Sequence, residues 1–220
     1  MVAIAIDGPA GAGKSTIARR VAEQLGYYYV DTGALYRAIG LFVLRAGKQP
    51  ANAEEVIPLL PQIQLTLGHT NGEQRVFLNQ EDVSEQIRTA EVSLASSQVS
   101  AIPQVRDFLL DLQRELAQKH NVVMDGRDIG TVVLPQAQVK IFLTASLEER
   151  ARRRWKEMCE KGMQADFATV LDDVRRRDEQ DMNRAVAPLV PADDSVLADT
   201  TGKTLQQSIE LLLSIIRSRM

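Results

Sequence analysis

The sequence predicts an α/β fold, a three-layer α/β/α sandwich with a mainly parallel sheet, because short apolar runs alternate with helical patterns along the chain. We expect strands to begin near residues 2, 27, 121, 139 and 195, with helices between them. Alternating apolar positions near residues 63–78, with a turn at Thr70-Asn71-Gly72, predict an inserted hairpin. The sandwich is therefore expected to carry a small antiparallel sheet.

The composition is that of an ordinary globular protein, with 220 residues and 45% hydrophobic content. A net charge of −3 gives no general attraction to nucleic acid or to an anionic membrane, so we expect neither as a partner. The apolar start ends at Asp7, too soon for a signal peptide or a membrane span. A single cysteine, Cys159, excludes an internal disulfide. We expect a cytoplasmic monomer.

The clearest motif follows the first apolar run directly and reads Gly8-Pro9-Ala10-Gly11-Ala12-Gly13-Lys14-Ser15-Thr16. It fits the G-x-x-x-x-G-K-[ST] pattern of a P-loop, whose backbone N–H groups converge on phosphate oxygens. Lys14 is expected to reach the β- and γ-phosphates of a nucleoside triphosphate, and the Ser15 hydroxyl to ligate Mg²⁺. The alternative is a glycine-rich turn that happens to carry a lysine. The strand before it and the helical pattern after it favour a nucleotide site.

Polar side chains also follow two later strands, where ligands of α/β sheets collect. Arg37 lies in the first turn of the helix after the strand near residues 27–31, and a glycine-spaced turn at residues 125–130 carries two acids and an arginine. Ser97 and Arg106 flank a joint between two helices, broken at Pro103. In isolation, a lone arginine or serine is as compatible with solvent exposure as with a ligand.

Two helices rich in arginine follow, and they could close over a polyphosphate as a lid. The first carries Arg150, Arg152, Arg153 and Arg154. In the second, Arg177, Asp181 and Arg184 share one face because they stand four and three residues apart. The alternative is a pair of solvated faces laced with ion pairs, which charge alone would favour.

The P-loop by itself does not name a reaction, since the same loop serves many nucleotide-binding proteins. The chain has no Asn-Lys-x-Asp guanine-reading motif and no Leu-Ser-Gly-Gly-Gln-like stretch of transport ATPases, whereas arginines recur near the expected cleft. Donor and acceptor phosphates repel each other, so an enzyme that joins them needs Lys, Arg and Mg²⁺ around the transferred group. These features favour phosphoryl transfer between two anionic ligands.

Taken together, several stretches resemble the bacterial cytidylate kinases, of the nucleoside monophosphate kinase family, over nearly the whole chain. The matching stretches are residues 6–16, 31–37, 125–133, 148–154 and 183–191. The hairpin region at residues 63–87 also resembles an insertion that sets these kinases apart from short adenylate kinases. In combination these stretches are far more specific than the P-loop alone.

The resemblance implies transfer of the γ-phosphate of ATP to CMP or dCMP. It implies that Ser97, Arg106 and Asp128 read the base, that Arg37, Arg127 and Arg184 hold the acceptor phosphate, that Arg177 and Asp181 address the ribose, and that Thr32 joins the CMP site. Residues 8–16, Arg150 and Arg154 would bind ATP, with Lys14, Arg127 and Arg184 in catalysis. Cytosine offers an N4 donor beside two acceptors, which suits a carboxylate, an arginine and a hydroxyl.

One position departs from the pattern: many nucleoside monophosphate kinases have glycine where this chain has Ser15, so the Mg²⁺ contact is not inherited from the family. We expect one P-loop kinase domain over residues 1–220, with its core at 1–36, 121–147 and 188–220. A monophosphate-binding insertion at 37–120 and a lid at 148–187 would complete it. Two alternatives stay open, a kinase for UMP or AMP and a nucleotide sensor without turnover.

Overall fold

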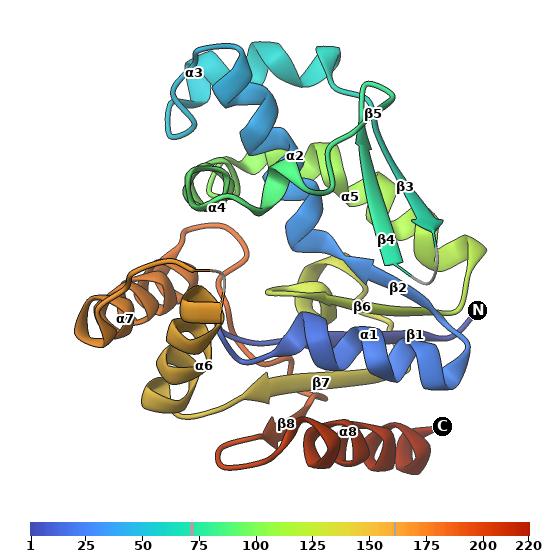
Figure 1. Cartoon of the computed structure of the whole chain (residues 1–220). Helices are drawn as coiled ribbons and strands as arrows, with labels where there is room; N and C mark the ends of the chain where they lie inside the picture. Colours follow the sequence, from blue (N-terminus) through green and yellow to red (C-terminus); the bar gives the residue numbers. More distant parts are fainter. Residues whose placement is uncertain (71–72, 161) are drawn as a thin grey trace. The chain divides into compact units, whose positions relative to one another are not determined.

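A computed structural model describes residues 1–70, 73–160 and 162–220, and the chain divides into two compact units (Figure 1). Unit 1 comprises Met1–Tyr29 and His120–Met220, and unit 2 comprises Val30–Lys119. The predicted P-loop and the arginine-rich helices belong to unit 1. The predicted hairpin belongs to unit 2.

Unit 1 is built on a five-stranded sheet with the order β2-β6-β1-β7-β8. Its strands are β1 (Ala3–Asp7), β2 (Tyr28–Asp31), β6 (Val122–Gly126), β7 (Val139–Thr144) and β8 (Val196–Asp199). The pairings of β1 with β6, of β1 with β7 and of β7 with β8 are all parallel, and β2 runs on into unit 2 at Val30. The predicted strands and the mainly parallel sheet are confirmed.

The central strand β1 is buried along its whole length, as expected for a parallel strand covered on both faces. In its register with β6, Ile6 lies opposite Asp125 and Asp7 lies opposite Gly126. Each strand therefore carries an acidic residue within its last two positions, Asp7 on β1 and Asp125 on β6, at the same edge of the sheet, where the loops that follow begin.

The helices of unit 1 are α1 (Lys14–Leu25), α6 (Leu147–Glu160), α7 (Phe167–Asn183) and α8 (Leu205–Arg219). Helix α1 begins after Gly13 and ends at Gly26, both in the left-handed conformation that glycine adopts without strain. Ile17 and Val21 of α1 share a buried cluster with Leu212 and Ile216 of α8 and with the sheet. This packing fixes the first turn of α1, and hence Lys14, against β1.

Unit 2 contains a three-stranded antiparallel sheet with the order β3-β4-β5, which confirms the predicted hairpin. Its elements are α2 (Thr32–Arg45), α3 (Ala53–Val56), a 3-10 turn (Ile57–Gln62), β3 (Leu65–Thr70), β4 (Glu73–Leu78), β5 (Glu81–Asp82), a second 3-10 turn (Gln86–Arg88), α4 (Ala90–Val99) and α5 (Pro103–Lys119). Leu67 of β3 lies opposite Val76 of β4. Of the predicted turn, Asn71 and Gly72 lie outside the described residues.

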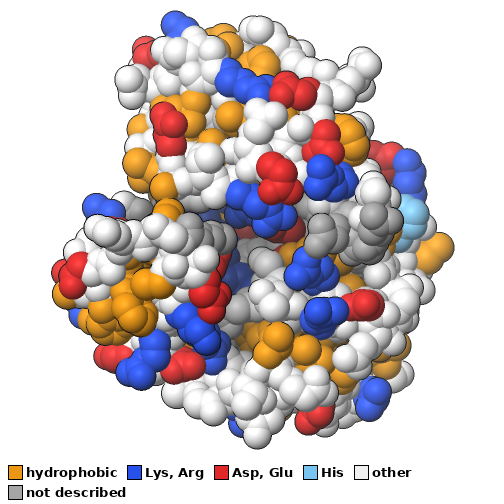
Figure 2. Space-filling model, viewed as in Figure 1, with side chains coloured by type: hydrophobic (Ala, Val, Ile, Leu, Met, Phe, Trp, Pro, Cys, Tyr) orange, Lys and Arg blue, Asp and Glu red, His pale blue; other side chains and the backbone are white. Residues whose placement is uncertain are grey.

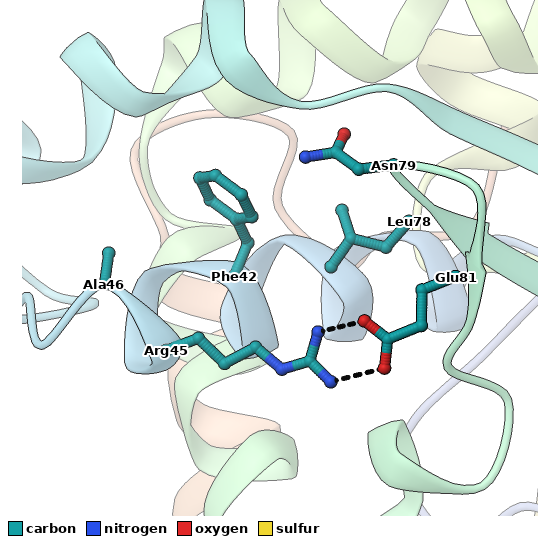
Figure 3. A pocket seen from close by; sticks show the side chains of 6 residues that line it. All are labelled: Phe42, Arg45, Ala46, Leu78, Asn79 and Glu81. Carbon is teal, nitrogen blue, oxygen red and sulfur yellow. Dashed lines mark hydrogen bonds and ion pairs between the residues drawn. The ribbon is translucent and has the colours of Figure 1, made fainter.

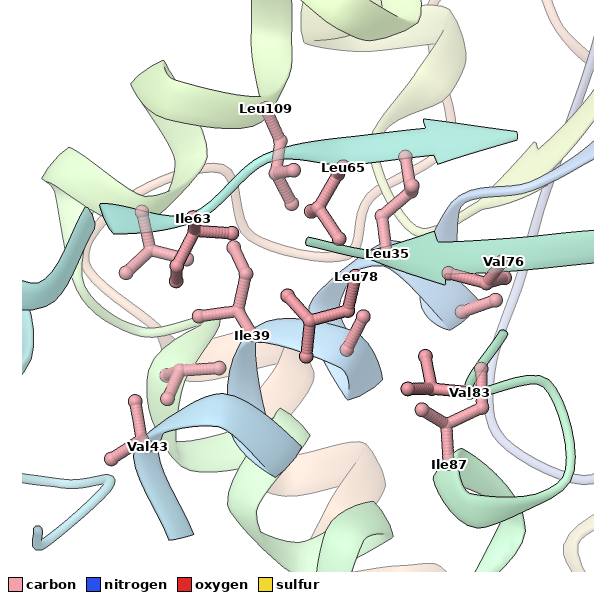
Figure 4. Packing of buried hydrophobic residues seen from close by; sticks show 14 of the residues in the cluster. Leu35, Ile39, Val43, Ile63, Leu65, Val76, Leu78, Val83, Ile87 and Leu109 are labelled. Atoms are coloured by element: carbon pink, nitrogen blue, oxygen red, sulfur yellow. The ribbon is translucent and has the colours of Figure 1, made fainter. Parts of the chain in front are cut away.

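The interior of unit 2 is aliphatic (Figure 4). Leu35, Ile39 and Val43 line one face of α2 at four-residue spacing and pack with residues of the small sheet, Leu65 and Leu78 among them. Arg37 stands about 200° around the helix from Leu35, so the same packing turns Arg37 away from this core. The core-forming face of α2 is thus separate from the predicted ligand Arg37.

Candidate functional site

The phosphate-binding loop of unit 1 runs from the end of β1 into α1 and depends on glycine for its path. Gly8 has a φ of 152°, and a Cβ at this position would lie 2.0 Å from the carbonyl oxygen of Leu143. Gly11 and Gly13 also have positive φ, of 74° and 84°. Only glycine lets the loop pass this close to β7 and then start the helix.

Lys14 is buried at the base of this loop, and its Nζ donates to the carbonyl oxygen of Pro9 at 2.8 Å. Burial, together with the nearby positive charge of Arg127, lowers the pKa of Lys14 to about 7. Nearby carboxylates such as Asp125 oppose this effect. A bound phosphate would act in the same direction as the carboxylates, so the site favours an anionic ligand.

Two arginines of α6 hold further carbonyl groups of the loop. Arg150 donates from Nη1 to the oxygen of Ala10 at 2.9 Å, and Arg153 donates from Nη1 to the oxygen of Ala12 at 3.3 Å. Arg153 also donates from Nη2 to the oxygen of Thr200 at 2.8 Å. The prediction that Arg150 contacts ATP stays a prediction, and the structure places its guanidinium on the loop backbone.

Ser15 lies beside a carboxylate near the end of β6. The Ser15 hydroxyl donates to Oδ2 of Asp125 at 2.9 Å, and the Tyr29 hydroxyl donates to Oδ1 of the same group at 2.9 Å. Asp125 is 3% exposed. A hydroxyl and a carboxylate side by side offer the oxygen ligands that Mg²⁺ prefers. The described residues contain no group of three or more His, Cys, Asp or Glu side chains that could hold a metal without a ligand's help.

The loop after β6 and the end of α7 form a second charged cluster. Nε of Arg127 lies 2.8 Å from Oδ2 of Asp181. Arg184 lies 3.8 Å from Asp181 and 3.8 Å from Asp128. Although burial alone would raise it, the charge and hydrogen bond of Arg127 hold the pKa of Asp181 below its usual value. The structure thus brings together four residues that the sequence predicts for CMP binding, on two segments far apart in the chain.

Asp7 is a site residue that the sequence analysis did not find. Its carboxylate accepts hydrogen bonds from the backbone N–H groups of Ile129 at 2.8 Å and Gly130 at 2.7 Å. Burial raises the pKa of Asp7 to about 6, although both hydrogen bonds oppose the shift. The signal in the sequence is a lone acid that ends an apolar strand directly before the P-loop. Asp7 fixes the start of the π-helical turn Ile129–Val133 and so supports the segment with Arg127 and Asp128.

Four predicted CMP-binding residues belong to unit 2. Arg37 donates to Oδ2 of Asp31 at 2.7 Å, and Asp31 also caps α2 by accepting from the N–H of Ala34 at 3.0 Å. Arg106 is buried, donates to the oxygen of Ser100 at 3.2 Å, and lies 5.5 Å from the centre of the Tyr36 ring. The other two are Thr32, which is buried on α2, and Ser97, which is half-buried on α4.

Three other arginines of α6 and α7 pair with acids on their own helices. Arg154 lies 3.1 Å from Glu157, and Arg175 and Arg176 lie 2.9 and 2.7 Å from Asp172 and Asp173. Figure 2 shows mixed Lys, Arg, Asp and Glu side chains around a hydrophobic area over α6 and α7, at the lower left. Most of the charge on these helices is therefore a solvated surface, and Arg150 is an exception. The role of Arg154 in ATP binding stays a prediction.

A family model described as cytidylate kinase matches residues 4–218. The chain belongs to the cytidylate kinase family. It is 47% identical, over 99% of its length, to a cytidylate kinase of Caldicellulosiruptor bescii, 98% of which is covered. It is 51% identical, also over 99% of its length, to a cytidylate kinase of Desulfitobacterium hafniense, 93% of which is covered. The resemblance inferred from the motifs is confirmed.

One solved structure, an uncharacterized protein from Eubacterium ventriosum, aligns with 99% of both chains at a TM-score of 0.55 and 14% identity. At this low identity the likeness shows the α/β fold alone. Within the described residues, no helix combines the length and the apolar character needed to cross a bilayer.

This cytidylate kinase family member also has a hollow of about 290 Å³ in unit 2, lined by Phe42, Arg45, Ala46, Leu78, Asn79 and Glu81 (Figure 3). Arg45 and Glu81 pair there through two hydrogen bonds of 2.8 Å. None of the predicted site residues lines this hollow. Because its two charged groups neutralise each other at the surface, the hollow has no unpaired charge for an ionic ligand.

Proposed function

We propose that this member of the cytidylate kinase family transfers the γ-phosphate of ATP to CMP or dCMP, giving CDP or dCDP and ADP. The observation that carries the proposal is family membership over nearly the whole chain, with relatives of almost the same length that are named cytidylate kinases. The two charged clusters of unit 1 support it, because one suits a donor phosphate and the other an acceptor phosphate.

On the donor side, the N–H groups of the P-loop and Lys14 bind the phosphates of ATP. Mg²⁺ bound with ATP neutralises phosphate charge, and the oxygens of Ser15 and Asp125 are the groups that would hold it. Lys14 then faces the phosphoryl group as it leaves ADP, where negative charge develops. Burial lowers the pKa of Lys14, and an added anion such as a phosphate would stabilise the charged form of the lysine.

On the acceptor side, a phosphate oxygen of CMP attacks the γ-phosphorus, and the bond to the oxygen that bridges the β- and γ-phosphates breaks. The bonding electrons stay on ADP. The nucleophile is already an anion, so no general base is needed and catalysis rests on alignment and charge stabilisation. We assign Arg127, Arg184 and Arg37 to the acceptor phosphate, and Arg177 and Asp181 to the ribose. Arg127 and Arg184 both lie beside Asp181 in the structure, so two guanidinium groups are close together for an acceptor phosphate.

For the base, we propose that Asp128 accepts from N4 of cytosine and that Arg106 and Ser97 address its acceptors. Uracil has O4 in place of the N4 amino group, so the Asp128 carboxylate would face an acceptor and lose its partner. Thr32 completes this assignment. We further propose a cytoplasmic monomer with a single kinase domain, in which residues 37–120 bind the monophosphate and residues 148–187 form a lid.

A coupled assay of ADP release tests the reaction, with CMP, dCMP, UMP and AMP offered separately at equal concentration. We expect ADP mainly with CMP or dCMP. In Asp128→Asn, turnover of CMP should fall by about 10²-fold relative to that of UMP, because the amide offers a donor to O4 of uracil and only a neutral acceptor to N4 of cytosine. Asp173→Asn, at an exposed position of α7, is the matched control.

If the wild type used UMP or AMP as well as CMP, the protein would still be a kinase, but the assignment of base-reading residues would be wrong. ATP binding without ADP release for any acceptor would instead favour a nucleotide sensor. Unchanged selectivity in Asp128→Asn would remove Asp128 alone from the proposed site.

A further inference from the structure

Arg150 joins three separate elements of unit 1 through one buried guanidinium. Nε donates to the oxygen of Ala145 at 2.9 Å, in the connection between β7 and α6. Nη1 donates to the oxygen of Ala10 in the P-loop at 2.9 Å, and Nη2 lies 2.7 Å from Oδ2 of Asp178 on α7. Arg150 is 6% exposed. Each of its three nitrogens therefore has a partner, and each partner lies on a different segment.

The contact with Ala10 has a direct consequence for the loop. In a planar trans peptide the carbonyl and the following N–H point in opposite directions, and the described residues contain no cis peptide. When Arg150 holds the carbonyl of Ala10, it also sets the direction of the Gly11 N–H, away from α6. Gly11 lies close to the helix as well, since a Cβ there would come within 3.0 Å of the Arg150 carbonyl oxygen. Arg150 thus orients one donor of the phosphate-binding loop.

The contact with Asp178 ties the same side chain to α7. Asp178 is 7% exposed, directly follows Arg177 and stands one helical turn before Asp181. A buried carboxylate without its arginine would be strongly disfavoured, so the pair holds α7 firmly. The rigid planar fork of a guanidinium fixes the directions of both partners at once. Displacement of Arg150 towards ATP would break two hydrogen bonds and one ion pair, and it would leave the buried Asp178 carboxylate without its cation.

We propose that Arg150 is a positioning residue that sets the P-loop in register with α7, and that it does not itself ligate the ATP phosphates. The proposal rests on the proposed function, because α7 carries the residues assigned to the acceptor. A phosphoryl transfer needs its two reactants aligned to within about 1 Å. A single side chain that contacts both the P-loop, which is assigned to ATP, and α7, which carries residues assigned to the acceptor, can impose that alignment.

Two single variants test the two contacts of Arg150 separately, the one with the P-loop and the one with α7. Asp178→Asn leaves the guanidinium on the loop but removes the charge that ties it to α7, so we expect kcat to fall by about 10²-fold with the KM for ATP within about two-fold of wild type. Arg150→Lys cannot reach three partners, so it should lower kcat and also raise the KM for ATP. Arg217→Ala, at an exposed position of α8 and outside the lid, is the control and should behave as wild type.

A double variant removes the link without leaving a buried charge. Arg150→Met with Asp178→Leu replaces both partners by apolar side chains, an exchange that proteins often tolerate without loss of stability. We expect a melting temperature near that of wild type together with a reduced kcat. Calorimetric titration of each variant with ATP, in the absence of any acceptor, should show weaker binding in Arg150→Lys and unchanged binding in Asp178→Asn.

Three results would overturn the proposal. Normal kcat in Asp178→Asn with a raised KM for ATP in Arg150→Lys would make Arg150 an ATP ligand. Lower melting temperatures with normal activity per folded molecule would make it a purely structural residue, as would normal kcat in the double variant. If the wild type used no acceptor at all, the proposed function would fail, and the titrations would still decide whether Arg150 and not Asp178 governs the loop.

Discussion

The two units of this chain treat charge in opposite ways. Unit 1 buries several charged groups next to its loops, whereas the interior of unit 2 is mostly aliphatic and its ion pairs are partly or fully exposed (Figure 4). Arg150 and Asp178 of unit 1 pair at 2.7 Å with at most 10% of either side chain exposed. Arg45 and Glu81 of unit 2 pair at 2.8 Å with 39% and 50% exposed. An arginine–carboxylate ion pair is therefore buried in unit 1 and exposed in unit 2.

The difference identifies the residues on which function depends. A buried charge is disfavoured unless hydrogen bonds, an opposite charge or a ligand compensate it. Unit 1 keeps such charges where a phosphate could supply part of that compensation. In unit 2, Arg106 is the charged side chain buried in the described residues, and it is one of the predicted base readers. Substitutions at buried charges should therefore change activity or stability, whereas substitutions at exposed pairs should change neither.

The largest effect is expected at Lys14. Lys14→Met keeps the apolar stem and removes the charge, so kcat should fall by about 10³-fold in the coupled assay. The melting temperature should change little, because burial already disfavours the charged form of this lysine. Lys119→Met removes an exposed lysine that is paired with Glu115, and it is the control for charge alone. A Lys14→Met enzyme within about 10-fold of wild type would show that the P-loop lysine is not the main source of stabilisation.

A medium effect is expected at Asp7, as a dependence of stability on pH. Because its pKa is raised to about 6, the folded protein holds this proton more tightly than the unfolded chain does. The stability it contributes is complete below pH 4 and is lost as the pH rises through 6, an effect of about 3 kcal/mol. Wild type should lose that amount relative to Asp7→Asn across this range, measured by urea unfolding.

The free energy of unfolding of wild type must be compared with that of Asp7→Asn, because other carboxyl groups change stability with pH in the opposite direction. The pKa values of Asp181 and Asp194 are lowered, so their contribution is lost as the pH falls, and it cancels when two variants that both contain them are compared. Parallel curves for wild type and Asp7→Asn between pH 4 and pH 7 would contradict the buried-acid interpretation. They would indicate that Asp7 is ionised in the folded protein throughout.

Local pattern was sufficient to predict most of the fold. The P-loop, the parallel strands and the hairpin are encoded by short stretches, such as the glycines of residues 8–13 and the alternation of Leu65 and Leu67. The acceptor cluster was predicted through a family resemblance, and Arg127, Asp181 and Arg184 do come together. Their joint position could not be derived from spacing alone, because it depends on how α7 packs.

The two residues with the clearest supporting role needed the structure. Arg150 stands in a run with Arg152, Arg153 and Arg154, and nothing in that run marks the arginine that turns inward. The buried neighbour Ala151 shows the side of α6 that faces α7, but only once the two helices are seen together. Asp7 acts on a segment more than a hundred residues away, through backbone N–H groups that no side-chain pattern reveals.

The smallest effect is expected at the surface pair of unit 2. Two hydrogen bonds from Arg45 and one from Gln86 lower the pKa of Glu81 to about 2, yet both partners are exposed and water competes for them (Figure 3). Glu81→Gln should therefore shift the melting temperature by no more than about 2 °C and leave kcat within about two-fold of wild type. A large loss of activity in this variant, with its fold intact, would mean that exposed charge in unit 2 also contributes to function, and the contrast between the two units would no longer hold.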